Sequence, residues 1–402
     1  MKDFLEHYLG TSKATPQFGL LGEVAGRKIA LDLNETHTIS LFGVQGGGKS
    51  YTLGTIIEMA TMSIPGINRL PSPLASVIFH YSNTQEYAPE FVSMAQANLE
   101  AQQLATLKAR YGAEGHALQD ILLLAPQDKV EDRQREYPGL TVRPLLFSAN
   151  ELQVSHWQFL LNAVGNNSMY MRQFKSLMRE HRKDLKIGLL REAVENSTMT
   201  PAAKELALAR LDLAADYIHD DAQISSFLIP GRLIIVDLRD EFIEKSEALS
   251  LFVILLQLFA DAKVDGQAFN KLVVFDEAHK YIDDPELIGN VVEIIREMRH
   301  KGTSILLASQ DPSSVPVKMI ELSTQIILHK FNSPAWLRHI QKANAALASL
   351  TPNGMAELRP GEAYIWSSKA SDGAFSSRAM KITGRPRVSR HGGDTKQAVS
   401  GE

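Results

Sequence analysis

The chain has 402 residues, 44% of them hydrophobic and 22% charged, with a formal net charge of −4 at pH 7. This composition is typical of a globular protein that buries a core, and it argues against a surface that is basic throughout. The absence of cysteine excludes disulfides, thiolate catalysis and cysteine-based zinc sites, and it fits a cytoplasmic protein.

The first part of the chain predicts strands around a glycine-rich turn. Its N-terminal residues lack the apolar core of a secretory signal. Residues 18–33 predict short strands interrupted by glycines, and 38–42 (TISLF) have the pattern of a buried strand. A glycine-rich turn, a helical pattern at 50–62 and a second buried strand at 76–80 (SVIFH) follow. This order of strand, glycine-rich loop and helix is the context that a phosphate-binding loop requires.

The middle of the chain, from about residue 89 to 229, is rich in Ala, Leu, Gln, Glu, Lys and Arg. These residues favour helices, although strand-like runs interrupt them at 121–124 and 141–147. We interpret this region as a mostly helical insertion and place its boundaries at 101–230.

Strands and helices alternate again in the last part of the chain. The predicted strands are 233–236, 272–275, 304–308 and 325–329, and the predicted helices are 247–262, 285–300 and 334–342. The most apolar run, 248–262, is shorter than the ~20 residues of a bilayer span, so we expect a buried core helix and no membrane segment. Apolar strands that alternate with helices predict an α/β protein with a parallel sheet covered on both faces.

Residues 43–50 (GVQGGGKS) match the pattern G-x-x-x-x-G-K-S of a phosphate-binding loop at every fixed position. Glycines let backbone N–H groups turn towards phosphate oxygens, and the following helix adds the positive end of its dipole. Lys49 is expected to reach the β- and γ-phosphates of ATP and Ser50 to ligate Mg²⁺. The alternative, a glycine-rich turn without a ligand, is disfavoured by the flanking strand and helix. The predicted nucleotide contacts are Gly43, Val44, Gln45, Gly46, Gly47, Gly48, Lys49, Ser50 and Tyr51.

Residues 272–280 (LVVFDEAHK) place two acids directly after an apolar strand. Such a strand carries Asp276 to the carboxyl edge of the sheet, where ligands of open α/β sheets bind. We expect Asp276 to hold the magnesium shell and Glu277 to act as a general base on the attacking water. The alternative is a core strand that ends in a solvated acidic turn. The string DEAH also occurs in a class of RNA helicases, but the rest of the helicase pattern is missing.

Two further catalytic candidates follow in the sequence. Gln310 ends the next predicted strand, where it could contact the γ-phosphate or the lytic water, or alternatively cap a turn. Arg299 ends a predicted helix and projects off its buried face. It could reach the γ-phosphate of a neighbouring subunit, but the residues alone favour a simple interaction with the negative end of the helix dipole.

The order of these elements resembles the HerA/FtsK superfamily of ring-forming, DNA-translocating ATPases, and HerA-like proteins most closely. The resemblance covers about 18–100 and 231–393, and its most specific part is 276–282 (DEAHKYI) followed by 296–313 (REMRHKGTSILLASQDPS). It implies a RecA-like ATPase core. The implied division is an N-terminal β element reduced from a small barrel (1–35), the two parts of the core (36–100 and 231–383), the insertion (101–230) and a C-terminal arm (384–402).

The same resemblance changes the interpretation of several residues. Arg299 falls on the arginine-finger position of the family, and Lys330 lies near a second basic position that these rings present across the subunit boundary. Where HerA proteins read Asp-x-x-Gly-Glu-Tyr, residues 82–87 read SNTQEY. Glu86 therefore stays a catalytic candidate, while the acid is lost and magnesium coordination must depend more on Ser50 and Asp276.

Two segments are locally basic. Residues 172–186 contain six basic and two acidic side chains, which predict phosphate contact, partner docking or simply a solvated helix face. The tail beyond residue 384 is also basic, and it predicts either an arm over a neighbouring subunit or a DNA-binding tail.

The leading functional interpretation is a hexameric motor that hydrolyses ATP and threads double-stranded DNA. The resemblance adds a partner nuclease and a role in phage defence. The alternative is a nucleotide-dependent switch or scaffold that recruits an effector without moving along DNA, because both need the same phosphate chemistry. A kinase is disfavoured, since an acid pair followed by a strand-end glutamine suits water as the nucleophile.

Overall fold

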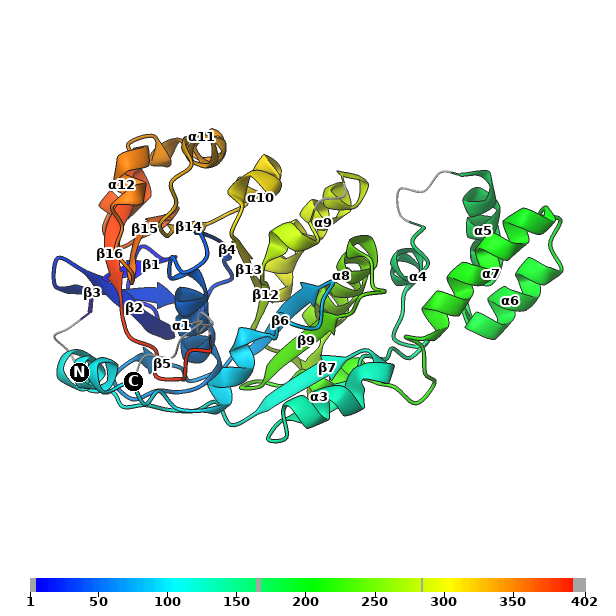
Figure 1. Ribbon diagram of the computed structural model, residues 1–402, viewed down its shortest axis with the longest axis horizontal. Coiled ribbons are helices and arrows are strands. Elements are labelled where there is room, and N and C mark those ends of the chain that lie inside the picture. The colour runs from blue at the N-terminus through cyan, green and yellow to red at the C-terminus, as the bar shows by residue number, and fades with distance from the viewer. Residues whose placement is uncertain (1–4, 164–167, 283–284, 393–402) are drawn as a thin grey trace.

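A single large sheet dominates the computed structural model, which describes residues 5–163, 168–282 and 285–392 (Figure 1). Within these residues the sheet has 14 strands, in the order β1-β3-β2-β16-β15-β14-β4-β13-β12-β6-β9-β7-β8, with β5 paired to β2. The strands from β14 to β8 in this order pair in parallel: β4 (Thr38–Phe42), β6 (Ala75–Ser82), β7 (Ile121–Ala125), β8 (Thr141–Pro144), β9 (Leu233–Arg239), β12 (Lys271–Phe275), β13 (Thr303–Ser309) and β14 (Gln325–Leu328).

The other strands extend the sheet beyond β14. They are β1 (Leu5–Leu9), β2 (Phe18–Val24), β3 (Arg27–Asp32), β5 (Asn68–Arg69), β15 (Glu362–Ser367) and β16 (Met380–Gly384). The predicted N-terminal β element, β1 to β3, joins the main sheet through the antiparallel pair β2 and β16. A separate hairpin is formed by β10 (Lys263–Val264) and β11 (Gln267–Ala268).

Helices cover both faces of the sheet, as the alternating pattern predicts. They are α1 (Lys49–Thr61), α2 (Ala101–Thr106), α3 (Val130–Glu136), α4 (Val154–Leu160), α5 (Met169–Glu180), α6 (Ile187–Glu195), α7 (Pro201–Ala215), α8 (Lys245–Asp261), α9 (Pro285–Met298), α10 (Val317–Ile320), α11 (Pro334–Ala343), α12 (Pro352–Ala356) and α13 (Ala374–Ser377). The most apolar run forms α8, which is buried along most of its length. No helix in the described ranges has the length and apolarity needed to cross a membrane.

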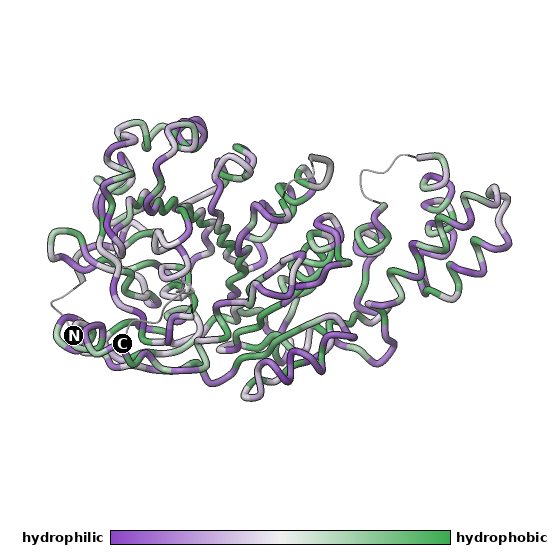
Figure 2. Tube along the Cα trace, in the orientation of Figure 1, coloured by the Kyte–Doolittle hydropathy of each residue, from purple (hydrophilic) through white to green (hydrophobic). Residues whose placement is uncertain are grey.

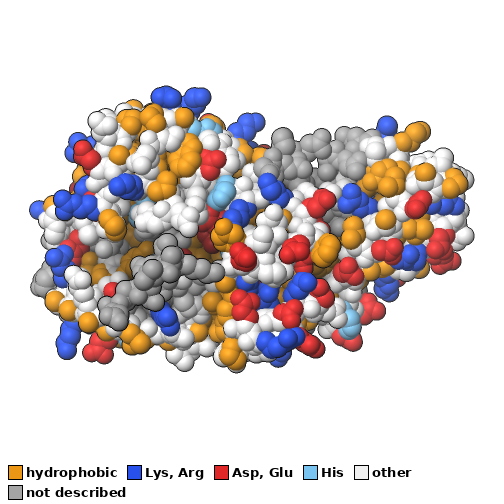
Figure 3. Space-filling view, viewed as in Figure 1, with side chains coloured by type: hydrophobic (Ala, Val, Ile, Leu, Met, Phe, Trp, Pro, Cys, Tyr) orange, Lys and Arg blue, Asp and Glu red, His pale blue; other side chains and the backbone are white. Residues whose placement is uncertain are grey.

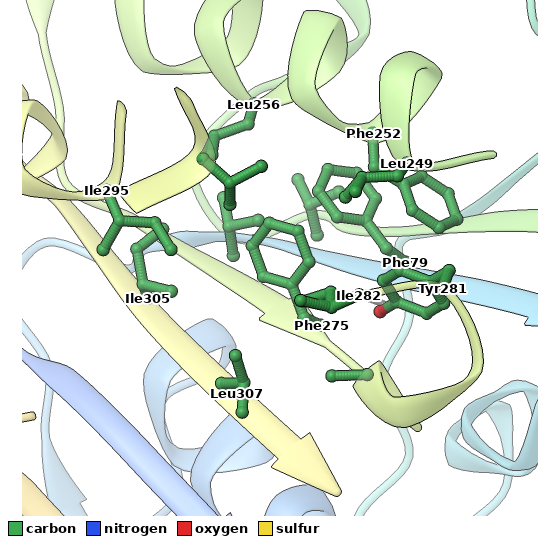
Figure 4. Close-up of a cluster of buried hydrophobic side chains, with 14 of the residues drawn as sticks. Phe79, Leu249, Phe252, Leu256, Phe275, Tyr281, Ile282, Ile295, Ile305 and Leu307 are labelled. Atoms are coloured by element: carbon green, nitrogen blue, oxygen red, sulfur yellow. The ribbon is translucent and has the colours of Figure 1, made fainter. Parts of the chain in front are cut away.

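The two faces of β6 show why the sheet needs helices on both sides. Successive side chains of a strand point to opposite faces, so Phe79 packs in the layer under α8 while Ile78 packs in the layer under α1. In Figure 2 the strands at the centre of the sheet are hydrophobic along their length. Figure 4 shows Phe79 stacked on Phe252, with ring centroids 4.5 Å apart, beside Phe275 and Tyr281. This layer anchors the end of β12, where the acid pair begins.

The predicted insertion divides into two structurally different parts. Its strand-like runs form β7 and β8, which lie beside β9 in the main sheet. Its helices α4 to α7 project from one end of the sheet (Figure 1) and have an apolar core of their own, which includes Trp157, Phe174, Leu190 and Leu211. The boundaries 101–230 stay a prediction.

The chain enters and leaves this helical bundle through adjacent residues. Phe147 N donates to Tyr217 O at 2.8 Å, and His219 N donates to Phe147 O at 2.9 Å.

The predicted basic segment, residues 172–186, is exposed on α5 and the turn after it, where acidic side chains lie among the basic ones: Lys186 Nζ is 3.1 Å from Asp184 Oδ1. Figure 3 shows the same mixture of basic and acidic side chains over the visible face of the bundle.

The described residues of the predicted C-terminal arm pack against their own chain and do not extend away from it. Residues 385–391, here called the C-terminal strap, fold back across α1 of the same chain. Arg385 Nη1 lies 2.6 Å from Glu58 Oε1, and both side chains are 0% exposed. The same carboxylate also accepts from the backbone N of Ser389 at 3.0 Å. A buried carboxylate such as that of Glu58 requires charged or hydrogen-bonding partners, and the strap supplies them to α1. Residues 393–402 lie outside the described residues.

Candidate functional site

The glycine-rich loop connects the end of β4 to the start of α1, as its sequence predicts. Gly46 and Gly48 have φ values of 73° and 100°, a left-handed conformation that disfavours side chains. Gly43 is required for a different reason, because a Cβ there would lie 2.7 Å from the Cβ of His329. The loop therefore needs glycine both for its turns and for its close approach to β14.

The site brings together three predicted catalytic side chains from separate elements. Lys49 Nζ, at the start of α1, lies 2.6 Å from Glu277 Oε1. Gln310 Nε2, after β13, donates to the same oxygen at 2.8 Å. Burial by itself lowers the pKa of Lys49, but the carboxylates of Asp276 and Glu277 outweigh it and raise that pKa above its ordinary value. Lys49 therefore keeps its positive charge.

Asp276 is buried beside this cluster. Its Oδ2 lies 3.8 Å from His80 Nδ1, while its buried Oδ1 has no hydrogen-bond partner in the described part of the chain. Burial by itself raises the pKa of Asp276. His80 and the charge on Lys49 outweigh burial, so the pKa lies below its ordinary value. An ionised carboxylate with a free buried oxygen suits a Mg²⁺ shell, and the half-buried Ser50 lies in the first turn of α1. These residues fit the predicted ion.

The backbone of the acid pair is held in place from the core. Glu277 has a φ of 47°, which is uncommon for a residue with a side chain. The hydroxyl of the buried Tyr281 donates to Asp276 O at 3.0 Å and ties down this turn. His279 Nδ1 lies 3.3 Å from Glu277 Oε2. Burial outweighs that carboxylate and lowers the pKa of His279, which favours the neutral ring.

His329 is a functional candidate that the sequence analysis missed. It follows β14, and its ring lies between the loop and α1: Nε2 is 2.9 Å from Thr52 Oγ1 and Nδ1 is 3.1 Å from Glu362 O. Since a carbonyl only accepts, Nδ1 donates and Nε2 accepts from the threonine. Burial, with the charge of Lys49 as a smaller cause, lowers the pKa of His329 to about 4. No local sequence pattern marks this residue, because its partners come from two distant segments, the loop with α1 and the start of β15.

Three predicted residues make no side-chain contact with Lys49, Glu277 or Gln310 among the contacts of the described residues. Glu86 is exposed in the loop after β6. Arg299 is exposed at the amino end of β13, the opposite edge of the sheet from Gln310. Lys330 contacts the loop through its backbone, since its carbonyl accepts from Val44 N at 3.1 Å.

Gln85 stands where the HerA pattern has glycine, and the structure explains this difference. Arg133 Nη2 donates to its Oε1 at 2.7 Å, and Arg239 Nη1 donates to its backbone carbonyl at 2.9 Å. Both arginines also lie within 2.8 Å of the fully buried carboxylate of Asp237. A glycine in place of Gln85 would lose the side-chain contact that attaches this loop to α3.

The parallel order of the central strands, with the loop after β4 and the acid pair after β12, defines the RecA-like P-loop NTPase fold. Solved structures with this fold match nearly the whole chain. The bacterial plasmid coupling protein TrwB, in complex with the ATP analogue ADPNP, has a TM-score of 0.55 at 13% identity, covering 98% of this chain and 97% of TrwB. VirB4 of Thermoanaerobacter pseudethanolicus has a TM-score of 0.52 at 11% identity, with 93% and 98% covered.

A third structure, TrwB with ADP and Mg²⁺, has a TM-score of 0.55 at 12% identity and covers 98% of this chain and 96% of TrwB. The chain matches no family model and no curated protein. The similarity to the solved structures of TrwB and VirB4 confirms the predicted α/β, RecA-like fold class. The HerA-like assignment stays a prediction.

Proposed function

We propose that the chain is an ATPase that binds ATP and Mg²⁺ at residues 43–51 and hydrolyses the γ-phosphate. The observation that carries the proposal is the position of Glu277, whose carboxylate contacts both Lys49 and Gln310 at the carboxyl edge of the sheet. Beside it, Asp276 offers a buried oxygen without a hydrogen bond. The glycine-rich loop, the proposed base Glu277 and the proposed metal ligand Asp276 thus lie at one edge of the sheet.

Each residue has a distinct role in this proposal. Lys49 has three donors, so it can bind the phosphates with those that Glu277 does not use. Asp276 and Ser50 would hold Mg²⁺, which neutralises charge on the β- and γ-phosphates. Glu277 would take the proton of the attacking water, and Gln310, attached to the same carboxylate, would orient that water.

A ring of subunits is part of the proposal, and the position of Arg299 supports it. Arg299 precedes β13 and Gln310 follows it; seven residues of strand at ~3.3 Å each separate them by about 20 Å. Arg299 therefore does not reach the phosphate site of its own chain. As an arginine finger it would act on the site of a neighbouring subunit.

The proposed substrate of the motor is double-stranded DNA, threaded through a hexamer. Its support is the sequence resemblance and the shared fold with TrwB, a protein described as a conjugative coupling protein. The partner nuclease and the phage-defence role rest on the sequence resemblance alone.

The test is the rate of ATP hydrolysis by a hexameric sample with and without duplex DNA. We expect hydrolysis that Lys49→Ala abolishes, stimulation by duplex of any sequence, and DNA binding that weakens steeply as salt rises. Hydrolysis that survives Lys49→Ala would overturn the ATPase. Hydrolysis that is unaffected by DNA would replace the motor with the switch or scaffold.

A further inference from the structure

The C-terminal strap contacts α1 immediately beside the phosphate loop. Tyr51 follows Ser50 directly, and its hydroxyl accepts from Arg387 N at 2.8 Å and donates to Gln103 Oε1 at 3.0 Å. One turn later, a Cβ on Gly54 would lie 2.4 Å from Arg387 Cζ. A glycine at this position therefore allows the strap to approach the helix.

The end of the strap presents a second ring to Tyr51. The His391 ring lies edge-on to that of Tyr51, with centroids 5.4 Å apart and an interplanar angle of 67°. His391 Nδ1 is 2.7 Å from Glu90 Oε1, and this contact fixes the imidazole. Tyr51 is half-buried and the His391 side chain is 34% exposed. Two aromatic rings thus form a corner at the first turn of α1.

The position of this corner relative to Lys49 suggests its occupant, given the proposed ATPase. Lys49 and Glu277 define where the γ-phosphate lies, and the nucleoside is attached at the opposite end of the triphosphate. Residues two apart in a helix point about 200° apart, so Tyr51 lies on the side of α1 opposite Lys49. A triphosphate that spans the loop from one side to the other would place the nucleoside near Tyr51.

We propose that Tyr51 and His391 form the wall that binds the base of the nucleoside triphosphate, so that the C-terminal strap completes the nucleotide site of its own chain. A planar base would stack on one ring and meet the edge of the other, the geometry that aromatic groups prefer. This inference rests on the proposed ATPase, and it adds a second contact region to that site. The base is remote from the reacting phosphate, so these rings affect binding and leave the chemical step unchanged.

The experiment compares two probes, ATP and inorganic tripolyphosphate, each with Mg²⁺, by calorimetric titration. Removing an aromatic ring that stacks on a base weakens binding about tenfold. Tyr51→Ala and His391→Ala should therefore raise the Kd of ATP about tenfold and leave the Kd of tripolyphosphate unchanged. Tyr51→Phe keeps the ring and should recover most of the affinity. Arg390→Ala, an exposed strap residue outside the corner, is the matched control and should bind ATP normally.

The steady-state kinetics provide an independent measurement. Each alanine variant should raise KM for ATP with kcat within about twofold, because it removes binding common to the ground and transition states. Equal weakening of ATP and tripolyphosphate, or unchanged ATP binding in both variants, would overturn the base wall while leaving the ATPase intact. Failure of the unaltered chain to bind either probe would overturn the ATPase, and the base wall with it.

Discussion

Replacing Glu277 with glutamine isolates the proposed base from the rest of the site. Glu277 Oε1 lies 2.6 Å from Lys49 Nζ and 2.8 Å from Gln310 Nε2. A glutamine has nearly the same shape, and its oxygen can accept from both donors, so the loop should keep its conformation. It does not take a proton from water, and the loss of a general base costs roughly 10²–10⁴ in rate. We expect kcat to fall at least about 100-fold.

The same substitution should tighten ATP binding. Lys49 keeps its charge, so its hydrogen bond to a glutamine stays charge-assisted, and the substitution removes only the Coulomb attraction of the carboxylate. That attraction is on the order of 1 kcal/mol or more at this separation, and the freed charge of Lys49 becomes available to the phosphates. The expected result is a Kd for ATP about fivefold lower.

Single-turnover hydrolysis with excess protein measures the chemical step, and equilibrium titration of ATP measures binding. Asp276→Asn is the matched control: it should weaken the Mg²⁺-dependent part of ATP binding, which Glu277→Gln retains. Turnover within tenfold of the unaltered protein, or weaker ATP binding by Glu277→Gln, would refute the assignment of the base.

Three other predictions concern different parts of the chain. Arg299→Ala should bind ATP without hydrolysing it. Mixing it with Lys49→Ala subunits should restore ATP hydrolysis, provided that a tagged pair first shows subunit exchange. Hydrolysis that stays at background in exchanged rings would contradict a role of Arg299 across the subunit boundary. Arg385→Met leaves the buried carboxylate of Glu58 without its ion pair, and it should lower the free energy of unfolding in urea by about 3–5 kcal/mol; a loss below about 1 kcal/mol would count against the pair. Because burial lowers the pKa of His329 from 6.5 to about 4, the unfolded chain binds a proton in this window that the folded chain does not, so stability should fall from pH 6.5 towards pH 4. Calorimetry across this range should show a shallower fall for His329→Asn, and an identical fall would exclude His329 as a cause.

The sequence predicts those parts of the site that short motifs encode. The phosphate loop and the acid pair are consecutive residues, and each follows an apolar strand. A parallel sheet brings the carboxyl ends of such strands to one edge, so the meeting of Lys49, Glu277 and Gln310 could be inferred before the structure. The α/β class follows in the same way from the alternation of strands and helices.

The features that the sequence did not predict depend on pairings between distant segments. His329 contacts Thr52 across 277 residues, and neither residue belongs to a pattern that indicates the other. The basic tail predicted either an arm over a neighbouring subunit or a DNA-binding tail, but Arg385 meets Glu58 of its own chain across 327 residues. Composition alone does not distinguish a buried cation from an exposed one, because the difference depends on whether the fold supplies a carboxylate.

The adjacent entry and exit of the helical bundle have a consequence for how this protein could change in evolution. Phe147 and His219 are hydrogen-bonded neighbours, so a short turn could connect the two sides in place of the helices between them. Such a deletion would leave every strand of the sheet, and the site at its edge, with its own partners. Its main cost would be the exposure of α8, against which α4 packs. The bundle is thus a part of the chain that could be exchanged among proteins of this fold without loss of the phosphate site.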